Sequence, residues 1–197
     1  MREVTVATIR LFGDHPVLDF TNTVNSRGAD FGPDVLTDFG DLLSWGMRVG
    51  VIEAAEENGL RKFTATRGEA VLAHAKALRE ALYRIFAARL SPAAADLDLL
   101  QRKVRAAHTM RVLVPDAGKI AWHWRPDDPD TVTHRIAFAA ADLITSPALG
   151  RVHVCPGDNC AWLFLDKSPS GRRVWCSEET CGTRDRVRRW RIRRQRA

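Results

Sequence analysis

The residues best suited to chemistry gather near the C-terminal end of this 197-residue chain. All four of its cysteines fall there in two pairs with the spacing C-x4-C-x15-C-x4-C: Cys155, Cys160, Cys176 and Cys181. Four thiolates in two local pairs suit one tetrahedral Zn²⁺, because zinc takes soft ligands and a structural site needs no further group. The pattern therefore predicts one structural zinc ion per chain, bound by these cysteines.

Two disulfides are the alternative use of four cysteines, at about 2 to 4 kcal/mol for each bridge. Zinc is favoured because a module of about 45 residues buries little core by itself, whereas structural zinc supplies about 10 to 16 kcal/mol of apparent binding energy. The expected compartment points the same way. The start of the chain contains Arg2, Glu3 and Arg10 and no long apolar run, so we expect a cytoplasmic protein with reduced cysteines.

A strong positive charge surrounds the cysteines. Residues 151–197 hold 12 of the chain's 30 Lys and Arg but only 5 of its 24 Asp and Glu, which leaves the first 150 residues close to neutral. Guanidinium groups fork onto phosphate oxygens and guanine edges, so this excess predicts a nucleic-acid partner. The candidate contact residues are Lys167, Arg172, Arg173, Arg184, Arg186, Arg188, Arg189, Arg191, Arg193 and Arg194.

Short elements must position the cysteines. Residues 155–160 have the composition of a zinc knuckle, in which Asn159 can take a left-handed backbone conformation. Residues 162–166 alternate as a strand, and residues 172–175 are expected to return beside it across the turn at 168–171. Knuckle, hairpin and helix in this order look like a treble-clef or zinc-ribbon finger.

An arginine-rich helix is predicted to follow the last cysteine. Thr183 is expected to cap it, and the narrow stripe formed by Thr183, Val187 and Trp190 is expected to pack on the hairpin. Arginines flank this stripe in two rows at helical spacing. The rows are Arg184, Arg188 and Arg191 on one side and Arg186, Arg189 and Arg193 on the other.

These motifs resemble a known family. The cysteine pairs, the strand WLFLD, the return S-x-x-G-x-R-x-W-C and the basic end resemble the CGNR-type zinc finger of bacterial proteins. LDFTNT, at residues 18–23, resembles the opening of the ABATE domain that precedes that finger and is described as a stress-induced transcription regulator. The resemblance implies a bacterial regulator that associates with the nucleoid when bound to DNA. One departure falls on the signature itself, since threonine stands at Thr183 where CGNR has asparagine.

The first 150 residues predict a mostly helical α+β domain with a small sheet, followed by the finger at 151–197. No run is apolar enough to cross a bilayer, so no membrane partner is expected. The expected elements are a strand within 1–12, a helix after Pro16, a helix from Thr37 to about Gly50, a helix from a capping box at Thr66 to about Leu90, a helix capped by Ser91-Pro92, a hairpin from Met110 to Trp124, and a helix from Asp128-Pro129 to Ser146-Pro147. We expect this domain to fold alone.

A polar stripe follows Pro16 on one side of the first predicted helix. Together with Arg27, it makes Asp19 and Asn22 candidate residues for a small-molecule effector site, and Trp45 of the next predicted helix, which also fits a core position, is added because aromatic side chains line such sites. The alternative is that these polar residues face solvent or cap neighbouring loops. A homodimer is also left open.

Three functions compete on the sequence alone. The first is a DNA-binding transcription regulator, and the second is a module for structured RNA or ribosomes, because phosphate contacts carry no base information. The third is an enzyme. The chain has no GxSxG, P-loop or dinucleotide motif, and a four-thiolate zinc leaves no position for water, so we expect no enzymatic activity.

Overall fold

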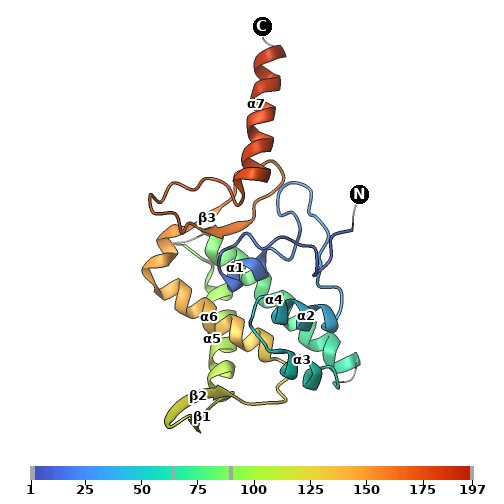
Figure 1. The fold of residues 1–197 in the computed structure, drawn as a ribbon, viewed down its shortest axis with the longest axis vertical. Coiled ribbons are helices and arrows are strands. Elements are labelled where there is room, and N and C mark those ends of the chain that lie inside the picture. Colours follow the sequence, from blue (N-terminus) through green and yellow to red (C-terminus); the bar gives the residue numbers. More distant parts are fainter. Residues whose placement is uncertain (1–2, 64, 89–90, 196–197) are drawn as a thin grey trace.

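Helices dominate the N-terminal part of the computed structural model, which describes residues 3–63, 65–88 and 91–195. Figure 1 shows them beneath a small sheet and a projecting C-terminal helix. They are α1 Pro16–Thr21, α2 Phe39–Arg48, α3 Ala54–Leu60, α4 Ala65–Ala88, α5 Ala94–Thr109 and α6 Thr131–Thr145. The two antiparallel hairpins pair β1 Arg111–Asp116 with β2 Lys119–Trp124, and β3 Val152–Val154 with β4 Leu163–Leu165. The α+β class and the hairpin between α5 and α6 are confirmed.

Helix α4 lies at the centre because its apolar residues recur at helical spacing. Val71, Ala75, Leu78, Leu82 and Ile85 are all buried, as the sequence predicted. Contacts from α1, α2, α5 and α6 surround this helix. The predicted end near Leu90 falls outside the described residues.

The N-terminal segment before α1 differs from the prediction. Residues 3–12 form turns rather than a strand. The hydroxyl of Thr8 accepts the backbone N–H of Thr5 at 2.9 Å, and the carbonyl of Thr5 accepts the N–H of Ile9 at 2.8 Å. These local hydrogen bonds compete successfully with an extended conformation.

Two predicted helix caps are also wrong. Helix α4 starts at Ala65, which puts Thr66 inside its first turn, and Ala93 precedes α5 without a side-chain cap. Helix α3 was not anticipated. It is held by a capping box between Glu53 and Glu56.

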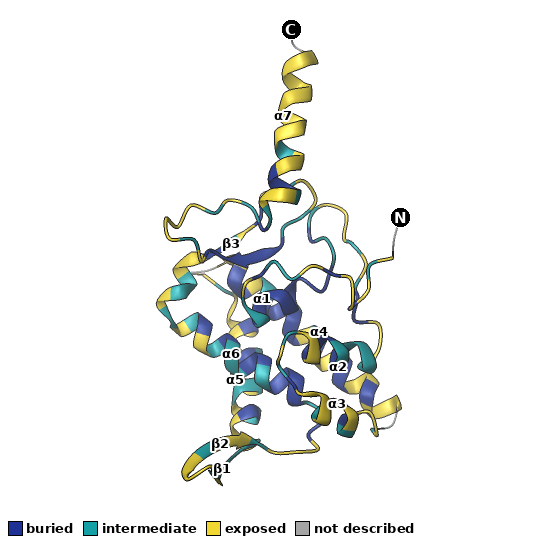
Figure 2. Cartoon of the chain, in the orientation of Figure 1, coloured by how far each residue is buried: buried dark blue, intermediate teal, exposed yellow. Residues whose placement is uncertain are grey.

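A single hydrophobic core joins the helices to β3 and β4. Val152, Trp162, Leu163 and Phe164 belong to the same buried cluster as the residues of α4, and β4 contacts both α1 and α4. Figure 2 shows the buried colouring continuing from the helices into the small sheet. The division of the chain into two domains near residue 150 remains a prediction. The hydrophobic core is continuous across that position.

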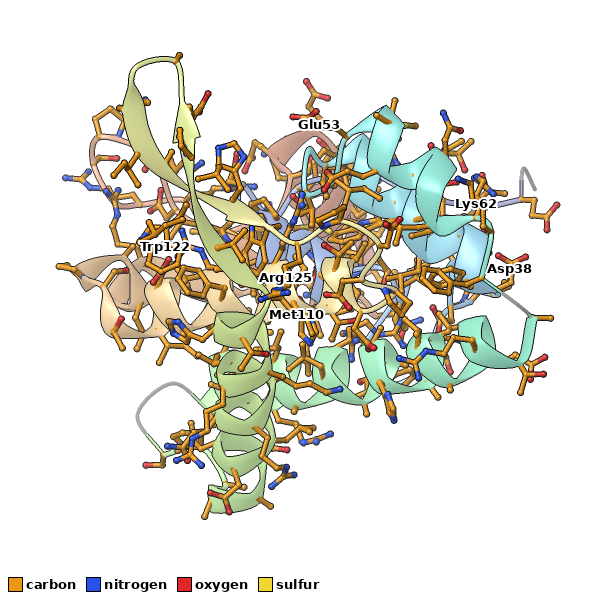
Figure 3. The ribbon with its side chains drawn as sticks, turned by 90° about the horizontal axis from the view of Figure 1, so that it is seen from below. Asp38, Glu53, Lys62, Met110, Trp122 and Arg125 are labelled. Atoms are coloured by element: carbon orange, nitrogen blue, oxygen red, sulfur yellow. The ribbon has the colours of Figure 1, made fainter. Side chains whose placement is uncertain are left out.

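Opposite ends of the molecule carry two exposed projections. The C-terminal helix is one, and the β1–β2 hairpin is the other (Figure 1). Figure 3 looks at the hairpin end, where Met110 and Arg125 meet at the base of the strands and the N–H of Arg125 donates to the carbonyl of Met110 at 2.8 Å. Among the described residues, no helix is both long and apolar enough to cross a membrane.

Candidate zinc centre and nucleic-acid interface

The four cysteine sulfurs converge on one point. All four lie within 4.8 Å of one another, and the Sγ of Cys176 is 3.6 Å from those of both Cys160 and Cys181. A tetrahedral site with Zn–S bonds of about 2.3 Å separates its sulfurs by about 3.8 Å. None of the cysteines forms a disulfide. They are therefore positioned to bind one zinc ion.

The first two ligands come from a knuckle between β3 and β4. The N–H of Cys155 donates to the carbonyl of Trp162 at 2.8 Å, and Asn159 takes the predicted left-handed conformation with φ 58°. Gly157 lies against the sulfurs, because a Cβ there would stand 3.0 Å from the Sγ of Cys181. A larger residue at this position would crowd the metal site.

Hydrogen bonding within the cluster prepares a thiolate. The neighbouring thiols of Cys160 and Cys176 lower the pKa of Cys155, and the same contacts raise the pKa of Cys176. The backbone N–H of Cys176 also donates to the Cys155 sulfur at 3.4 Å. Zinc binds cysteines as thiolates, so metal binding displaces the thiol protons of the cluster.

The hairpin of the finger differs from the prediction. Strand β4 pairs with β3, in the register Val152↔Leu165 and Val154↔Leu163, and residues 172–175 form no strand. The buried carboxylate of Asp166 explains the difference. It accepts the backbone N–H groups of Ser168 at 2.8 Å and Arg173 at 3.1 Å, which holds this segment as a loop.

The third ligand, Cys176, precedes a π-helical turn, Glu178–Gly182, and the fourth, Cys181, lies within it; the turn runs directly into α7 Thr183–Gln195. The hydroxyl of Ser177 accepts the N–H of Thr180 at 3.3 Å, so Ser177 caps this turn. Thr183 does not act as the predicted N-cap. Its hydroxyl donates to the carbonyl of Glu178 at 3.2 Å and accepts a hydrogen bond from Arg186 at 2.9 Å.

Helix α7 extends away from the body of the protein. It has no buried residue, and Figure 2 shows it exposed along nearly its whole length. Val187 and Trp190 are 42% and 53% exposed, so the predicted packing of this stripe on the hairpin is wrong. The π turn at the metal site leads into this helix, and none of its described residues is buried against the rest of the protein.

Comparison with protein families places this geometry in a known architecture. Residues 14–147 match the sequence model of ABATE, which is described as "Putative stress-induced transcription regulator". The chain belongs to the ABATE family. Residues 151–194 match the CGNR zinc finger. A search of curated proteins gave no match.

The arginines of the CGNR helix divide by their partners. Arg186 pairs with Glu178, Arg188 with Asp185 and Asp158, and Arg189 with Asp185. Within the described residues, Arg184, Arg191 and Arg193 form no ion pair, and the guanidinium of Arg194 lies 4.8 Å from the Trp190 ring centroid. Lys167 and Arg172 are exposed on the finger loop. The row that contains Arg184 and Arg191 is therefore the more open one.

Arg173 does not fit its predicted role as a phosphate contact. Its guanidinium is turned inward and lies 4.6 Å from the Phe164 ring centroid. It donates its hydrogen bonds to acceptors within the protein. These acceptors are the carbonyls of Phe12, Leu165, Trp175 and Cys176 and the carboxylate of Asp14. Arg173 clamps the finger loop to the ABATE domain.

The four candidate effector residues are engaged inside the ABATE protein. Asn22 bonds the backbone of Leu163, and Trp45 is fully buried with its ring 5.1 Å from that of Phe20. Asp19 accepts the N–H of Gly13 at 2.8 Å, and burial raises the pKa of Asp19 to about 6. The motif LDFTNT thus supplies contacts within the fold, and an effector site at these residues stays a prediction.

Arg27 belongs to a buried charge network that the sequence did not reveal. It pairs with Glu80 at 2.7 Å, and Arg79 pairs with both Glu80 and Asp34. The backbone N–H of Arg27 donates to the carbonyl of Cys160 at 2.9 Å, which connects this network to the knuckle. From the sequence, an arginine in a helix is expected to lie on the surface. The burial of Arg79 becomes evident only from its partner Asp34, which comes from a distant segment.

Proposed function

We propose that this ABATE protein is a zinc-dependent transcription regulator that binds duplex DNA through α7. The observation that carries the proposal is the exposure of this helix together with its charge. Seven of its thirteen residues are arginines, one is an acid, and none is buried. The arginines of such a helix repel one another in water, and binding to phosphate groups offsets that repulsion.

The dimensions of α7 suit a major groove. Thirteen residues span about 20 Å, and the groove is about 12 Å wide, so the helix can enter while its flanks reach phosphates on both sides. Zinc is required because the ligand Cys176 precedes the turn from which the helix starts and the ligand Cys181 lies within that turn. The ABATE domain then senses a ligand or brings copies of the chain together.

The two arginine rows have different proposed tasks. Arg186 and Arg189 pair with Glu178 and Asp185, and we assign them to backbone phosphates, which can replace these carboxylates and require no base-specific geometry. Arg184 and Arg191 have no acidic partner among the described residues, which leaves their guanidinium groups available for guanine edges. Sequence preference is therefore assigned to the row with Arg184.

Selection from random DNA duplexes tests this function, followed by titrations of the enriched duplex, a structured RNA and single strands over a range of salt. We expect an enriched motif and preference for the duplex. Arg184→Ala should relax selection at one position and cost about 1 to 3 kcal/mol, while Arg189→Ala should weaken all duplexes alike and reduce the salt slope by about one. Arg125→Ala, at the opposite end of the molecule, is the matched control (Figure 3). No enriched motif together with tighter binding to structured RNA would reassign α7 to RNA.

A further inference from the structure

A cavity of about 390 Å³ lies where the N-terminal segment, the loop after α1 and the zinc finger meet. Figure 1 shows the first segments of the chain beside the base of α7. The cavity is separate from the candidate effector residues of the LDFTNT stripe, none of which lines it. Its size falls within the range of about 300 to 1,000 Å³ that is usual for small-ligand sites.

Two arginines from distant parts of the chain line this cavity. Arg10 belongs to the N-terminal segment and Arg184 to the first turn of α7. Among the described residues neither has an acidic partner, and the guanidinium of Arg10 lies 5.7 Å from the centroid of the Phe12 ring. The lining contains one acid, Asp158, which pairs with Arg188. The guanidinium groups of Arg10 and Arg184 are therefore the unpaired cations of the lining, and an anion would bind to them directly, since four thiolates around Zn²⁺ carry a charge of −2 and give the cavity no net positive charge.

Neutral hydrogen-bonding groups and apolar groups complete the lining. The amide of Asn25 and the hydroxyl of Thr180 both line the cavity and have no partner within the described part of the chain. Ile9, Phe12 and Trp162 provide an apolar wall, with the two aromatic ring centroids 6.3 Å apart. Charge, uncommitted polar groups and apolar surface thus meet in one concave site.

We infer that this cavity binds a small organic monoanion, with its acidic head between Arg10 and Arg184 and its apolar body against Phe12 and Trp162. The head can be a carboxylate or a sulfonate, because both carry one negative charge and accept hydrogen bonds from guanidinium groups. Three zinc ligands, Cys160, Cys176 and Cys181, also line the cavity, so the site is complete only in the zinc-loaded protein. Binding of the anion does not depend on whether α7 contacts DNA.

A matched pair of dyes tests the site on the full-length, zinc-loaded protein without DNA. The anionic probe is 8-anilinonaphthalene-1-sulfonate, and the neutral control is N-phenyl-1-naphthylamine, which has the same rings without the sulfonate. We expect saturable binding of one anionic dye per chain, at least tenfold tighter than binding of the neutral dye. Equal affinity for the two dyes, or no saturable binding, would overturn the inference.

Variants locate the dye. The double variant Arg10→Ala/Arg184→Ala should lose at least tenfold in affinity for the sulfonate and little for the neutral dye. Arg102→Ala/Arg105→Ala removes the same charge from the exposed side of α5 and should leave both affinities unchanged. Zinc content is measured for each variant. Wild-type affinity for the sulfonate in the double variant would contradict the assignment.

Amide spectra of isotope-labelled wild-type protein decide the location independently of any variant. We expect the sulfonate dye to shift the resonances of Thr8, Asn25 and Thr180. The exposed apolar face of the β1–β2 hairpin, which includes Leu113, Ile120 and Trp122, is the competing surface for an aromatic dye. Shifts confined to residues 111–124 would overturn the inference.

Discussion

The side chain of Asn22 faces the backbone of Leu163 as a neighbouring β-strand would. Its amide nitrogen donates to the Leu163 carbonyl at 2.8 Å, and the Leu163 N–H donates to its amide oxygen at 3.0 Å. At the other end of α1, the carbonyl of Gly13 accepts the N–H of Leu165 at 2.9 Å. The two ends of a helix in the ABATE domain thus complete the open edge of the finger's sheet.

The Asn22 pair predicts a large loss of stability when the amide is removed. Asn22→Ala leaves a buried N–H and a buried carbonyl of β4 without partners, and should lower the free energy of unfolding by about 2 to 5 kcal/mol. Urea unfolding of the zinc-loaded protein measures the change. Asn58→Ala, on the exposed face of α3, should change it by less than about 0.5 kcal/mol. Similar values for both variants would show that the pair contributes little.

Zinc removal should destabilise the whole chain rather than the finger alone. The finger shares its hydrophobic core with the helices, so loss of the metal in Cys176→Ser also loosens the packing of Trp162 and Phe164. We expect one thermal transition whose midpoint falls by at least about 10 °C. Calorimetry with zinc analysis measures it. Two transitions, one of them unchanged, would restore an independently folding N-terminal domain.

Burial of Asp19 predicts a pH-dependent stability. Its pKa rises from 3.8 to about 6 mainly because of burial, with smaller effects from the Gly13 hydrogen bond and the charges of Asp14, Arg48 and Lys167. Since the folded state binds this proton more tightly, the contribution of Asp19 becomes less favourable as pH rises from about 4 to 6. Asp19→Asn keeps an acceptor for Gly13 and removes the charge.

The stability gained by Asp19→Asn should therefore increase by about 1 to 2 kcal/mol between pH 5 and pH 7. Denaturant unfolding of both proteins at each pH gives the difference, and the common effect of acid on the zinc site cancels when zinc contents match. A difference that shrinks as pH rises would mean that Asp19 is stabilised as a carboxylate in the fold.

Arg173 and Arg172 are adjacent but should respond differently to substitution. Arg173→Lys keeps the charge but cannot supply the planar fork that bonds several carbonyls, and should lower the free energy of unfolding by about 2 to 4 kcal/mol. Arg172→Ala removes an exposed side chain and should change it by less than about 0.5 kcal/mol. Urea unfolding compares them. A lysine variant as stable as the wild type would return Arg173 to the candidate phosphate contacts.

The zinc ligands, helix α4, the β1–β2 hairpin and the arginine-rich helix were all predictable from the sequence. Each depends on local information. Two cysteine pairs at equal spacing define a ligand set, an apolar residue at every third or fourth position defines the buried face of a helix, and alternation around a turn defines a hairpin. Helix starts were less predictable, because α4 begins at Ala65, one residue before the expected cap Thr66, and α5 begins at Ala94 after Ala93, which supplies no capping side chain.

Only the tertiary structure decided what β4 pairs with, where α7 points and what the polar residues do. Asn22 meets Leu163 across 141 positions of sequence, and Arg173 meets Phe12 across 161. From the sequence, Asn22 looks like a ligand contact and Arg173 like a phosphate contact, because residue type states which hydrogen bonds a side chain can make but not which partner packing brings within reach. A buried polar group needs a hydrogen-bond partner inside the fold. Asn22 and Arg173 find theirs across the boundary between the ABATE domain and the finger, and so connect the two.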